Sequence, residues 1–120
     1  MHEGQHGVLI VDDDEGIRES LCELLADEGY GAIGVANGQE ALKYLRAQPT
    51  PCLILLDLMM PVMNGWELHG HLKADPRLAA LPVIVITAAD DAHTRTIAAD
   101  EILPKPIPLE RILDVVGRYC

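Results

Sequence analysis

The fold is decided by the stretch Val8-Leu9-Ile10-Val11-Asp12-Asp13-Asp14. It opens on four apolar residues, mostly β-branched, and closes on three acids. An apolar run of this length without polar alternation is typical of a strand buried on both faces, as in the centre of a parallel sheet. The stretch Leu53-Ile54-Leu55-Leu56-Asp57 has the same design, and Pro82-Val83-Ile84-Val85-Ile86-Thr87 is a third apolar run. The three runs predict a buried sheet whose strands end on polar residues.

The segments between these runs place their apolar residues at helical spacing. Residues 17–25 follow the i, i+4, i+7, i+8 pattern of an amphipathic helix. Two weaker strands are expected at 30–36 and 102–103, and Gly31 and Gly34 suit the first of them to a sheet edge. The remaining expected helices are 37–48, 66–75, a short one within 90–100, and 109–116.

Strand and helix alternate along the whole chain. This alternation predicts an α/β fold, with one parallel sheet and helices on both of its faces. We expect Asp14 or Asp13 to cap the first helix and Gly29 to end it. The dipeptide Asn64-Gly65 predicts a tight turn before the third helix.

Composition narrows the class of protein. The chain has 120 residues, of which 49% are hydrophobic, and a formal net charge of −10. These values indicate one globular domain over residues 1–120, with residues 1–6 as a flexible tail. The acidic balance argues against direct nucleic-acid contact and against an anionic membrane surface, since both require clustered Lys and Arg. No apolar run approaches the ~20 residues of a membrane span, and the polar start carries no signal peptide, so we expect a cytoplasmic protein.

The number and spacing of the cysteines also favour a cytoplasmic protein. Cys22, Cys52 and Cys120 are an odd number of cysteines without short spacing. Cys22 and Cys52 lie in apolar stretches, where a free thiol behaves as a small hydrophobe. A disulfide framework is therefore not expected, in keeping with a reducing compartment.

Polar residues at the strand ends are the candidate site, because ligands of such folds bind at the carboxyl ends of parallel strands. Asp12 and Asp13 follow the first run, Asp57 and Thr87 end later runs, and Lys105 follows the fifth strand. Taken singly, each has a commoner role in a turn, a cap or solvent, but together they suggest one shared site. Clustered carboxylates favour Mg²⁺, with Mn²⁺ as an alternative, and the hydroxyl and the ammonium would complement a phosphoryl group. Asp57 is the candidate nucleophile, since carboxylates form aspartyl phosphates.

The chain resembles a response-regulator receiver domain of two-component signalling, nearly end to end. The resemblance is carried by four motifs in the family's order, at residues 8–14, 56–68, 85–88 and 103–106. It implies a flavodoxin-like, doubly wound sheet with strand order 2-1-3-4-5, as in single receivers of the chemotaxis type. It also implies a cis peptide bond between Lys105 and Pro106.

The reaction that the resemblance implies is phosphoryl transfer. Asp57 would accept the phosphoryl group from a phosphohistidine of a sensor histidine kinase or a phosphotransfer protein, in a Mg²⁺-dependent reaction. The domain would catalyse its own phosphorylation and a slow autodephosphorylation rather than act as a conventional enzyme. The phosphorylated face would then bind a downstream protein target, and a weak homodimer is a further option.

The resemblance also implies which residues hold the two groups. The metal ligands would be Asp12, Asp13, Asp57 and the backbone carbonyl of Met59. The phosphoryl oxygens would be contacted by Thr87, Lys105 and the backbone N–H of Ala88.

Two features depart from the family's pattern. Ile102 stands three residues before the lysine, where family members usually carry Tyr or Phe, so no aromatic rotamer can signal there. Thr87 and Lys105 are 18 residues apart, about one helical turn less than is usual, which predicts a shortened fourth helix. Met59 and Ala89 flank the acceptor without a group that could position a water molecule, so we expect slow hydrolysis.

Two other functions stay open at this point. A pseudo-receiver, which binds partners without being phosphorylated, fits Ile102 and the short fourth helix, whereas the retained acids, Thr87 and Lys105 favour working chemistry. A Mg²⁺ phosphohydrolase of the haloacid-dehalogenase kind also forms an aspartyl phosphate. Such enzymes carry a second Asp two residues after the nucleophile, where this chain has Met59.

Overall fold

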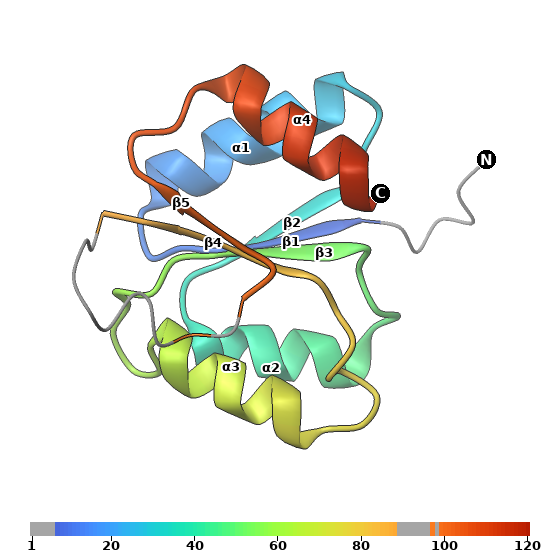
Figure 1. The fold of residues 1–120 in the computed structure, drawn as a ribbon, viewed down its shortest axis with the longest axis vertical. Coiled ribbons are helices and arrows are strands. Elements are labelled where there is room, and N and C mark those ends of the chain that lie inside the picture. The colour runs from blue at the N-terminus through green and yellow to red at the C-terminus, as the bar shows by residue number, and fades with distance from the viewer. Residues whose placement is uncertain (1–6, 89–96, 98) are drawn as a thin grey trace.

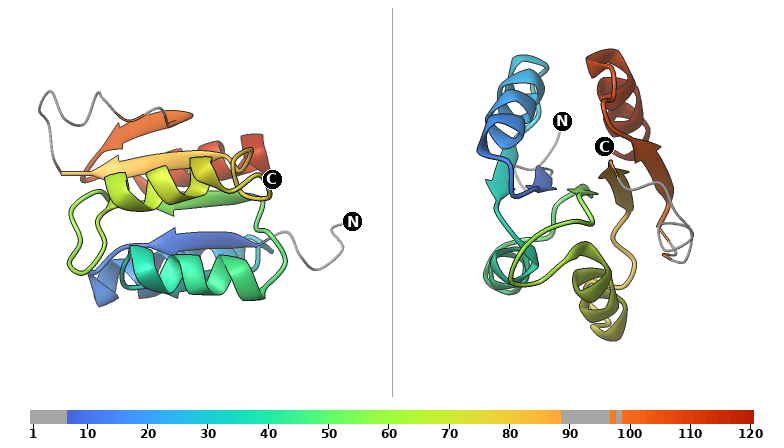
Figure 2. Two further views of the ribbon diagram at one scale, coloured as in Figure 1. Left: turned by 90° about the horizontal axis from the view of Figure 1, so that it is seen from below. Right: turned by 90° about the vertical axis from the view of Figure 1, so that its left-hand side faces the viewer.

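A five-stranded sheet lies between two layers of helices (Figure 1). The structure is a computed structural model and describes residues 7–88, 97 and 99–120. Within these residues, helices α1 and α4 cover one face of the sheet, and α2 and α3 cover the other (Figure 2). The elements in chain order are β1 (Val8–Val11), α1 (Glu15–Asp27), β2 (Ala32–Val35), α2 (Gly38–Ala47), β3 (Leu53–Leu56), α3 (Gly65–Ala74), β4 (Val83–Thr87), β5 (Glu101–Pro104) and α4 (Leu109–Tyr119).

All neighbouring strands run parallel, in the order β2-β1-β3-β4-β5. The predicted α/β class, the doubly wound topology and the implied strand order are therefore confirmed. β2 lies at one edge of the sheet, as its glycines predicted, and β5 lies at the other. The short helix expected within residues 90–100 falls largely outside the described residues, so its shortening stays a prediction. Residues 1–6 also lie outside them.

The central strands are buried on both faces. In β1, Leu9 and Val11 belong to the core under α2 and α3, whereas Val8 and Ile10 belong to the core under α1 and α4. β3 and β4 divide their residues between the two cores in the same way. Burial on both faces explains why these runs carry no polar residue until the backbone leaves the sheet.

Both ends of α1 follow the sequence prediction. Asp14 is the N-cap, and its Oδ1 accepts a hydrogen bond of 3.2 Å from the backbone N–H of Ile17. Gly29 follows the helix with a φ of +88°, a conformation that favours glycine. The N–H of Tyr30 still donates to the Leu25 carbonyl at 2.9 Å. β2 therefore begins later than expected, because the start of its predicted range completes the end of α1.

The tight turn predicted at Asn64-Gly65 is wrong, because these residues begin α3. The backbone of Glu67 donates to Asn64 Oδ1 at 2.9 Å, and the backbone of Asn64 donates to Glu67 Oε1 at 3.0 Å. This reciprocal pair is a capping box. A Cβ added to Gly65 would lie 2.8 Å from the carbonyl oxygen of Asp57. Glycine therefore lets the start of α3 approach the chain just beyond β3.

The expectation of free cysteines is wrong for two of the three. Cys52 and Cys120 form a disulfide, with their Cα atoms 5.5 Å apart, and Cys22 is free. α4 runs back across the sheet, so that its C-terminal end reaches the edge where β3 begins (Figure 1). No local pattern indicates this pairing, because the two cysteines are 68 residues apart and meet only through the topology.

Among residues 7–88, 97 and 99–120, no helix has both the length and the apolar character that crossing a bilayer requires. The nine described elements are all short, and the longest is α1 with 13 residues.

Candidate functional site

Register brings the first two acids together. Val11 of β1 pairs with Leu56 of β3, so the carboxyl ends of the two strands lie side by side. The next residue of each strand is an aspartate, and the backbone N–H of Asp57 donates to the Val11 carbonyl at 2.9 Å. Asp12 and Asp57 are both buried. The parallel pairing of two apolar runs thus places two carboxylates next to each other, as the sequence predicted.

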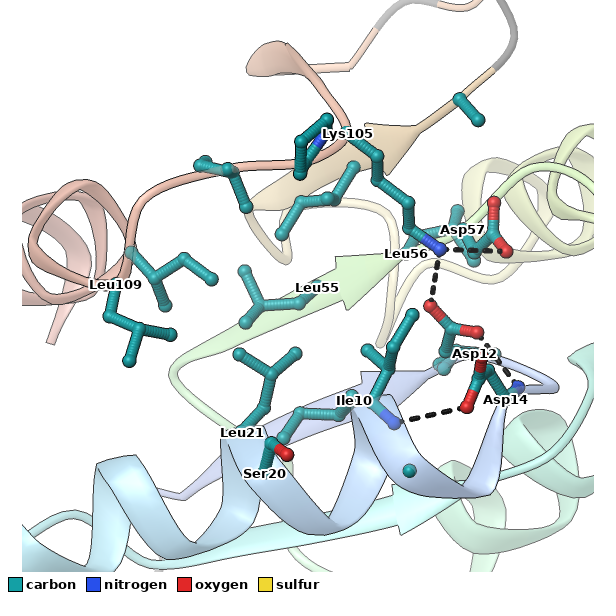
Figure 3. Close-up of a pocket in the computed structure, with 18 residues that line it drawn as sticks. Ile10, Asp12, Asp14, Ser20, Leu21, Leu55, Leu56, Asp57, Lys105 and Leu109 are labelled. Atoms are coloured by element: carbon teal, nitrogen blue, oxygen red, sulfur yellow. Dashed lines mark hydrogen bonds and ion pairs between the residues drawn. The ribbon is translucent and has the colours of Figure 1, made fainter.

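Lys105 joins these carboxylates. Its Nζ lies 2.8 Å from Asp12 Oδ2 and 3.3 Å from Asp57 Oδ2, between the two side chains (Figure 3). Its backbone N–H donates to the carbonyl of Thr87 at 3.0 Å, which ties the loop after β5 to the end of β4. The Lys105–Pro106 peptide bond is cis, as the resemblance implied. Four strand ends therefore contribute to one cluster.

The loop after β1 is held by contacts that sequence analysis missed. Asp12 Oδ1 accepts a hydrogen bond of 2.9 Å from the backbone N–H of Asp14, and the Asp12 carbonyl accepts one of 2.8 Å from Arg18 Nη1. A Cβ on Gly34 would lie 3.2 Å from the Arg18 side chain, so this glycine lets the arginine stem cross β2. The available signal was a basic residue one helical turn after the acids. We assign Arg18 as a positioning residue for the Asp12 loop.

Electrostatics favour a further cation in this cluster. Burial raises the pKa of Asp57, and the charge of Asp12 adds to this effect, whereas Lys105 opposes it. Partial burial disfavours the ammonium of Lys105, but its hydrogen bond to Asp12 and the charges of Asp57 and Asp12 outweigh burial and raise its pKa. Lys105 is therefore protonated at neutral pH. Counted formally, its three carboxyl groups and one ammonium carry a charge of −2.

The donor set of this cluster fits a small hard cation. Asp12, Asp13 and Asp57 each offer a carboxylate oxygen, and these oxygens lie within 4.8 Å of one another. Asp13 is exposed, whereas the other two acids are buried, so one ligand faces solvent and the others face the protein. Oxygen-only sets with several carboxylates suit Mg²⁺ or Mn²⁺ rather than zinc.

The remaining predicted residues lie around Asp57. Thr87 ends β4 and is buried, and Ala88 follows it and is exposed. The backbone N–H of Met59 donates to Asp57 Oδ1 at 3.3 Å, and the residue as a whole is 59% exposed. The structure thus brings Met59 next to the acceptor through its N–H. The roles predicted for its carbonyl, for the Thr87 hydroxyl and for the Ala88 N–H stay predictions.

A pocket of about 700 Å³ adjoins the cluster, between α1 and α4. Asp12, Asp57 and Lys105 form its polar end, and aliphatic side chains from the sheet and both helices line the rest, among them Leu21, Leu55 and Leu109 (Figure 3). Asp57 is therefore reached from a recess whose walls are largely apolar.

Fold and site together define a class. A doubly wound parallel sheet whose carboxyl ends carry paired aspartates, a third aspartate and a bridging lysine is the architecture of signal receiver domains. The response regulator receiver domain family matches residues 8–117. The chain belongs to this family. The match covers the sheet, the whole acidic cluster and the described helices except for the last two residues of α4.

Individual relatives agree with this assignment. The response regulator MprA of Mycolicibacterium vanbaalenii is 38% identical over 110 residues, which cover 88% of this chain and 46% of that protein. The chain thus spans about half the length of the curated relatives that it matches. The receiver domain of a signal transduction histidine kinase from Syntrophus aciditrophicus is 34% identical, with a TM-score of 0.87 over 95% of this chain and 89% of that one.

A third relative was solved with ligands. The response regulator TrrA of Thermotoga maritima, in complex with Mg²⁺ and BeF, is 31% identical to this chain, with a TM-score of 0.82. The match covers 96% of this chain and 99% of that one.

Proposed function

We propose that this domain is a phosphoacceptor switch in which Asp57 takes a phosphoryl group from a phosphohistidine of a partner protein. The observation that carries the proposal is the contact of the buried Asp57 carboxylate with Lys105 Nζ at 3.3 Å, beside Asp12 and at one end of an open pocket. A buried carboxylate is costly unless it is paired, and the Lys105 ammonium is the partner that offsets this cost. The family assignment supports the same function.

Asp12, Asp13 and Asp57 would hold Mg²⁺, together with the Met59 carbonyl, and Mn²⁺ would suit the same oxygens. The ion supplies positive charge that offsets the charge of the carboxylates and of the phosphoryl oxygens. The complex of TrrA with Mg²⁺ and BeF supports this assignment for a relative of the same fold.

In the proposed transfer, a carboxylate oxygen of Asp57 forms a bond to phosphorus while the phosphorus–nitrogen bond of the donor imidazole breaks. The electron pair of that bond stays on the imidazole nitrogen. Lys105 already reaches Asp57 and would contact the incoming phosphoryl oxygens, with the Thr87 hydroxyl and the Ala88 N–H as further donors. Each of these groups lies at a strand end, so little reorganisation is required before transfer.

Return to the resting state would occur by hydrolysis. Water attacks phosphorus, inorganic phosphate leaves, and the Asp57 carboxylate is restored. The Met59 side chain, exposed beside the acceptor, has no strong donor or acceptor with which to orient that water. We therefore propose slow autodephosphorylation; Ala89, the other flanking position, lies outside the described residues.

Partners and location belong to the same proposal. A sensor histidine kinase or a phosphotransfer protein would donate the phosphoryl group, and a protein target would bind the phosphorylated domain. Ile102 is 37% exposed on β5, the edge strand, where it offers an aliphatic contact in place of an aromatic switch. The domain would dimerise weakly through that edge and would make no direct contact with nucleic acid or membrane. We also propose a single domain over residues 1–120 and a cytoplasmic location.

The experiment is phosphorylation by an acyl-phosphate donor with Mg²⁺, followed by intact mass spectrometry. Wild type and the control Asp114→Asn, which changes an exposed acid of α4, should each gain one phosphoryl group. Asp57→Asn should gain none, and omission of Mg²⁺ should abolish the gain in every variant. A wild type that gains no phosphoryl group would overturn the proposal and favour a pseudo-receiver. Steady release of phosphate from a monoester substrate would instead indicate a phosphohydrolase.

A further inference from the structure

The disulfide lies at the amino ends of the strands, whereas the acidic site lies at their carboxyl ends. Cys52 directly precedes β3, whose other end leads into Asp57, and Cys120 directly follows α4, the helix that comes after Lys105. The chain on either side of β3 is thus tied twice, once to the loop after β5 and once to the residue after α4. An ion pair of 3.3 Å joins Asp57 to Lys105 at the carboxyl ends of the strands, and a covalent bond joins Cys52 to Cys120 at the amino ends.

Both cysteines are partly exposed to solvent. Each is half-buried and packs against the core under α1 and α4. The Cα separation of 5.5 Å is the ordinary value for a disulfide, so the bond closes without moving the backbone. Cys22 lies on α1 and belongs to the same core, but it is free, and burial raises its pKa despite the opposing charge of Arg18.

We propose that Cys52 and Cys120 form a reversible thiol–disulfide modification site, which opens and closes by exchange with glutathione and fastens the C-terminal end of α4 to the start of β3. The argument for reversibility rests on the cytoplasmic location proposed above, where glutathione keeps most thiol pairs reduced and the disulfides that do form are usually transient. The proposal does not depend on phosphorylation of Asp57.

Closure balances with glutathione disulfide as the oxidant. The thiolate of one cysteine attacks a sulfur of glutathione disulfide, which forms a mixed disulfide and releases one glutathione thiolate. The thiolate of the second cysteine then attacks the protein sulfur of that mixed disulfide and releases a second glutathione. The protein pair loses two electrons and two protons, and one glutathione disulfide becomes two molecules of glutathione.

Opening should loosen one end of α4 rather than unfold it. In the reduced protein, α4 keeps the contacts of Arg118 and Tyr119 with Glu101 of β5, at 3.2 and 3.3 Å, and the buried side chains of Ile112, Val115 and Val116. The covalent tie spans 68 residues, so its loss also frees the unfolded chain. We expect reduction to lower Tm by about 10 °C for a domain of this size.

The first measurement maps the bond. The full chain is equilibrated in glutathione buffers that range from strongly reducing to strongly oxidising, quenched in acid, alkylated under denaturing conditions and digested with trypsin. Peptide 47–73 should be linked to the peptide that begins at Tyr119 in oxidising buffers, and both should be alkylated in reducing ones. Peptide 19–43, which holds Cys22, should be alkylated throughout. A bond that is present at every ratio, absent at every ratio or formed by Cys22 would overturn the proposal.

The second measurement links the bond to α4. Cys52→Ser and Cys120→Ser should each show the lower Tm in all buffers, whereas Cys22→Ser should keep the redox-dependent shift of about 10 °C. Hydrogen exchange should quicken on reduction in the last turn of α4 and stay unchanged in α3, on the other face. Phosphorylation of Asp57 is assayed separately, so its failure would leave both readouts intact. Equal Tm values and equal exchange for the reduced and oxidised protein would contradict the fastening role.

Discussion

The two faces of the sheet are built differently. On one face, α2 and α3 contact each other and close over a continuous aliphatic core. On the other face, a pocket of about 700 Å³ lies between α1 and α4, and a disulfide ties the end of α4 to β3. The closed face provides the scaffold, whereas the open face gives access to the acids. One sheet therefore carries a closed core on one face and a pocket that leads to the acids on the other.

The largest expected effect tests the closed face. Leu68 of α3 is fully buried, so Leu68→Ala leaves a cavity and should lower the free energy of unfolding by about 2–5 kcal/mol. Leu109 of α4 lines the pocket and is 52% exposed, so Leu109→Ala should cost about 0.5 kcal/mol or less. Urea unfolding of both variants measures the difference. Equal losses would show that the two faces are packed alike.

The next effect tests the acidic cluster. Mg²⁺ that binds the folded state alone should raise the free energy of unfolding by about 2.7 kcal/mol at a concentration of 100 times its Kd, and chelation should remove this gain. Asp13 is exposed, so Asp13→Asn should fold normally but respond to Mg²⁺ only weakly. The control Asp114→Asn should respond as wild type does. Thermal unfolding across a Mg²⁺ titration provides the readout, and an equal response from Asp13→Asn would remove this residue from the ligand set.

A smaller effect concerns the Asp12 loop. Arg18→Ala removes the hydrogen bond of 2.8 Å to the Asp12 carbonyl and should lower the free energy of unfolding by about 1 kcal/mol. It should also slow phosphorylation by an acyl-phosphate donor, because the loop that carries Asp12 loses its anchor. Arg46→Ala, at an exposed position of α2 on the closed face, is the matched control and should change neither quantity. Unchanged phosphorylation in Arg18→Ala would remove its positioning role.

The smallest effect is a pH dependence in metal-free buffer. Burial raises the pKa of Asp57, so the folded protein binds this proton more tightly than the unfolded chain does. Stability from this group is therefore lost as pH rises from the unfolded value of 3.8 through the higher folded pKa. Asp57→Asn abolishes that loss, so its advantage over wild type should grow between pH 4 and pH 7. Urea unfolding measured at several pH values would show a constant difference if the carboxylate were not destabilised by burial.

Sequence reasoning succeeded where one strong physical constraint acts locally. A strand buried on both faces tolerates no polar residue, so β1, β3 and β4 were visible as apolar runs. Because parallel strands end on the same side of the sheet, their carboxyl ends predicted that Asp12, Asp57 and Thr87 lie on that side. The strand order and the cis bond at Lys105 came from the family resemblance and not from spacing.

Sequence reasoning failed where the structure depends on how elements distant in the chain come into contact. The pairing of Cys52 with Cys120 follows from the direction of α4 across the sheet, and no local spacing encodes it. Gly65 was assigned to a turn because Asn-Gly is a strong turn signal, yet the capping box with Glu67 and the close carbonyl of Asp57 make it the first residue of a helix. Arg18 gained its role only through the backbone that it reaches.

The most direct test of the central claim is the location of the phosphoryl group. Wild type is phosphorylated by an acyl-phosphate donor with Mg²⁺, reduced with borohydride, which converts an acyl phosphate to an alcohol, and digested with trypsin. Asp57 lies in peptide 47–73, whereas Asp12 and Asp13 lie in the peptide that ends at Arg18, so the digest places the candidates in two different peptides. The account predicts reduction at Asp57 alone. Reduction at Asp12 or Asp13, or at no aspartate, would contradict it.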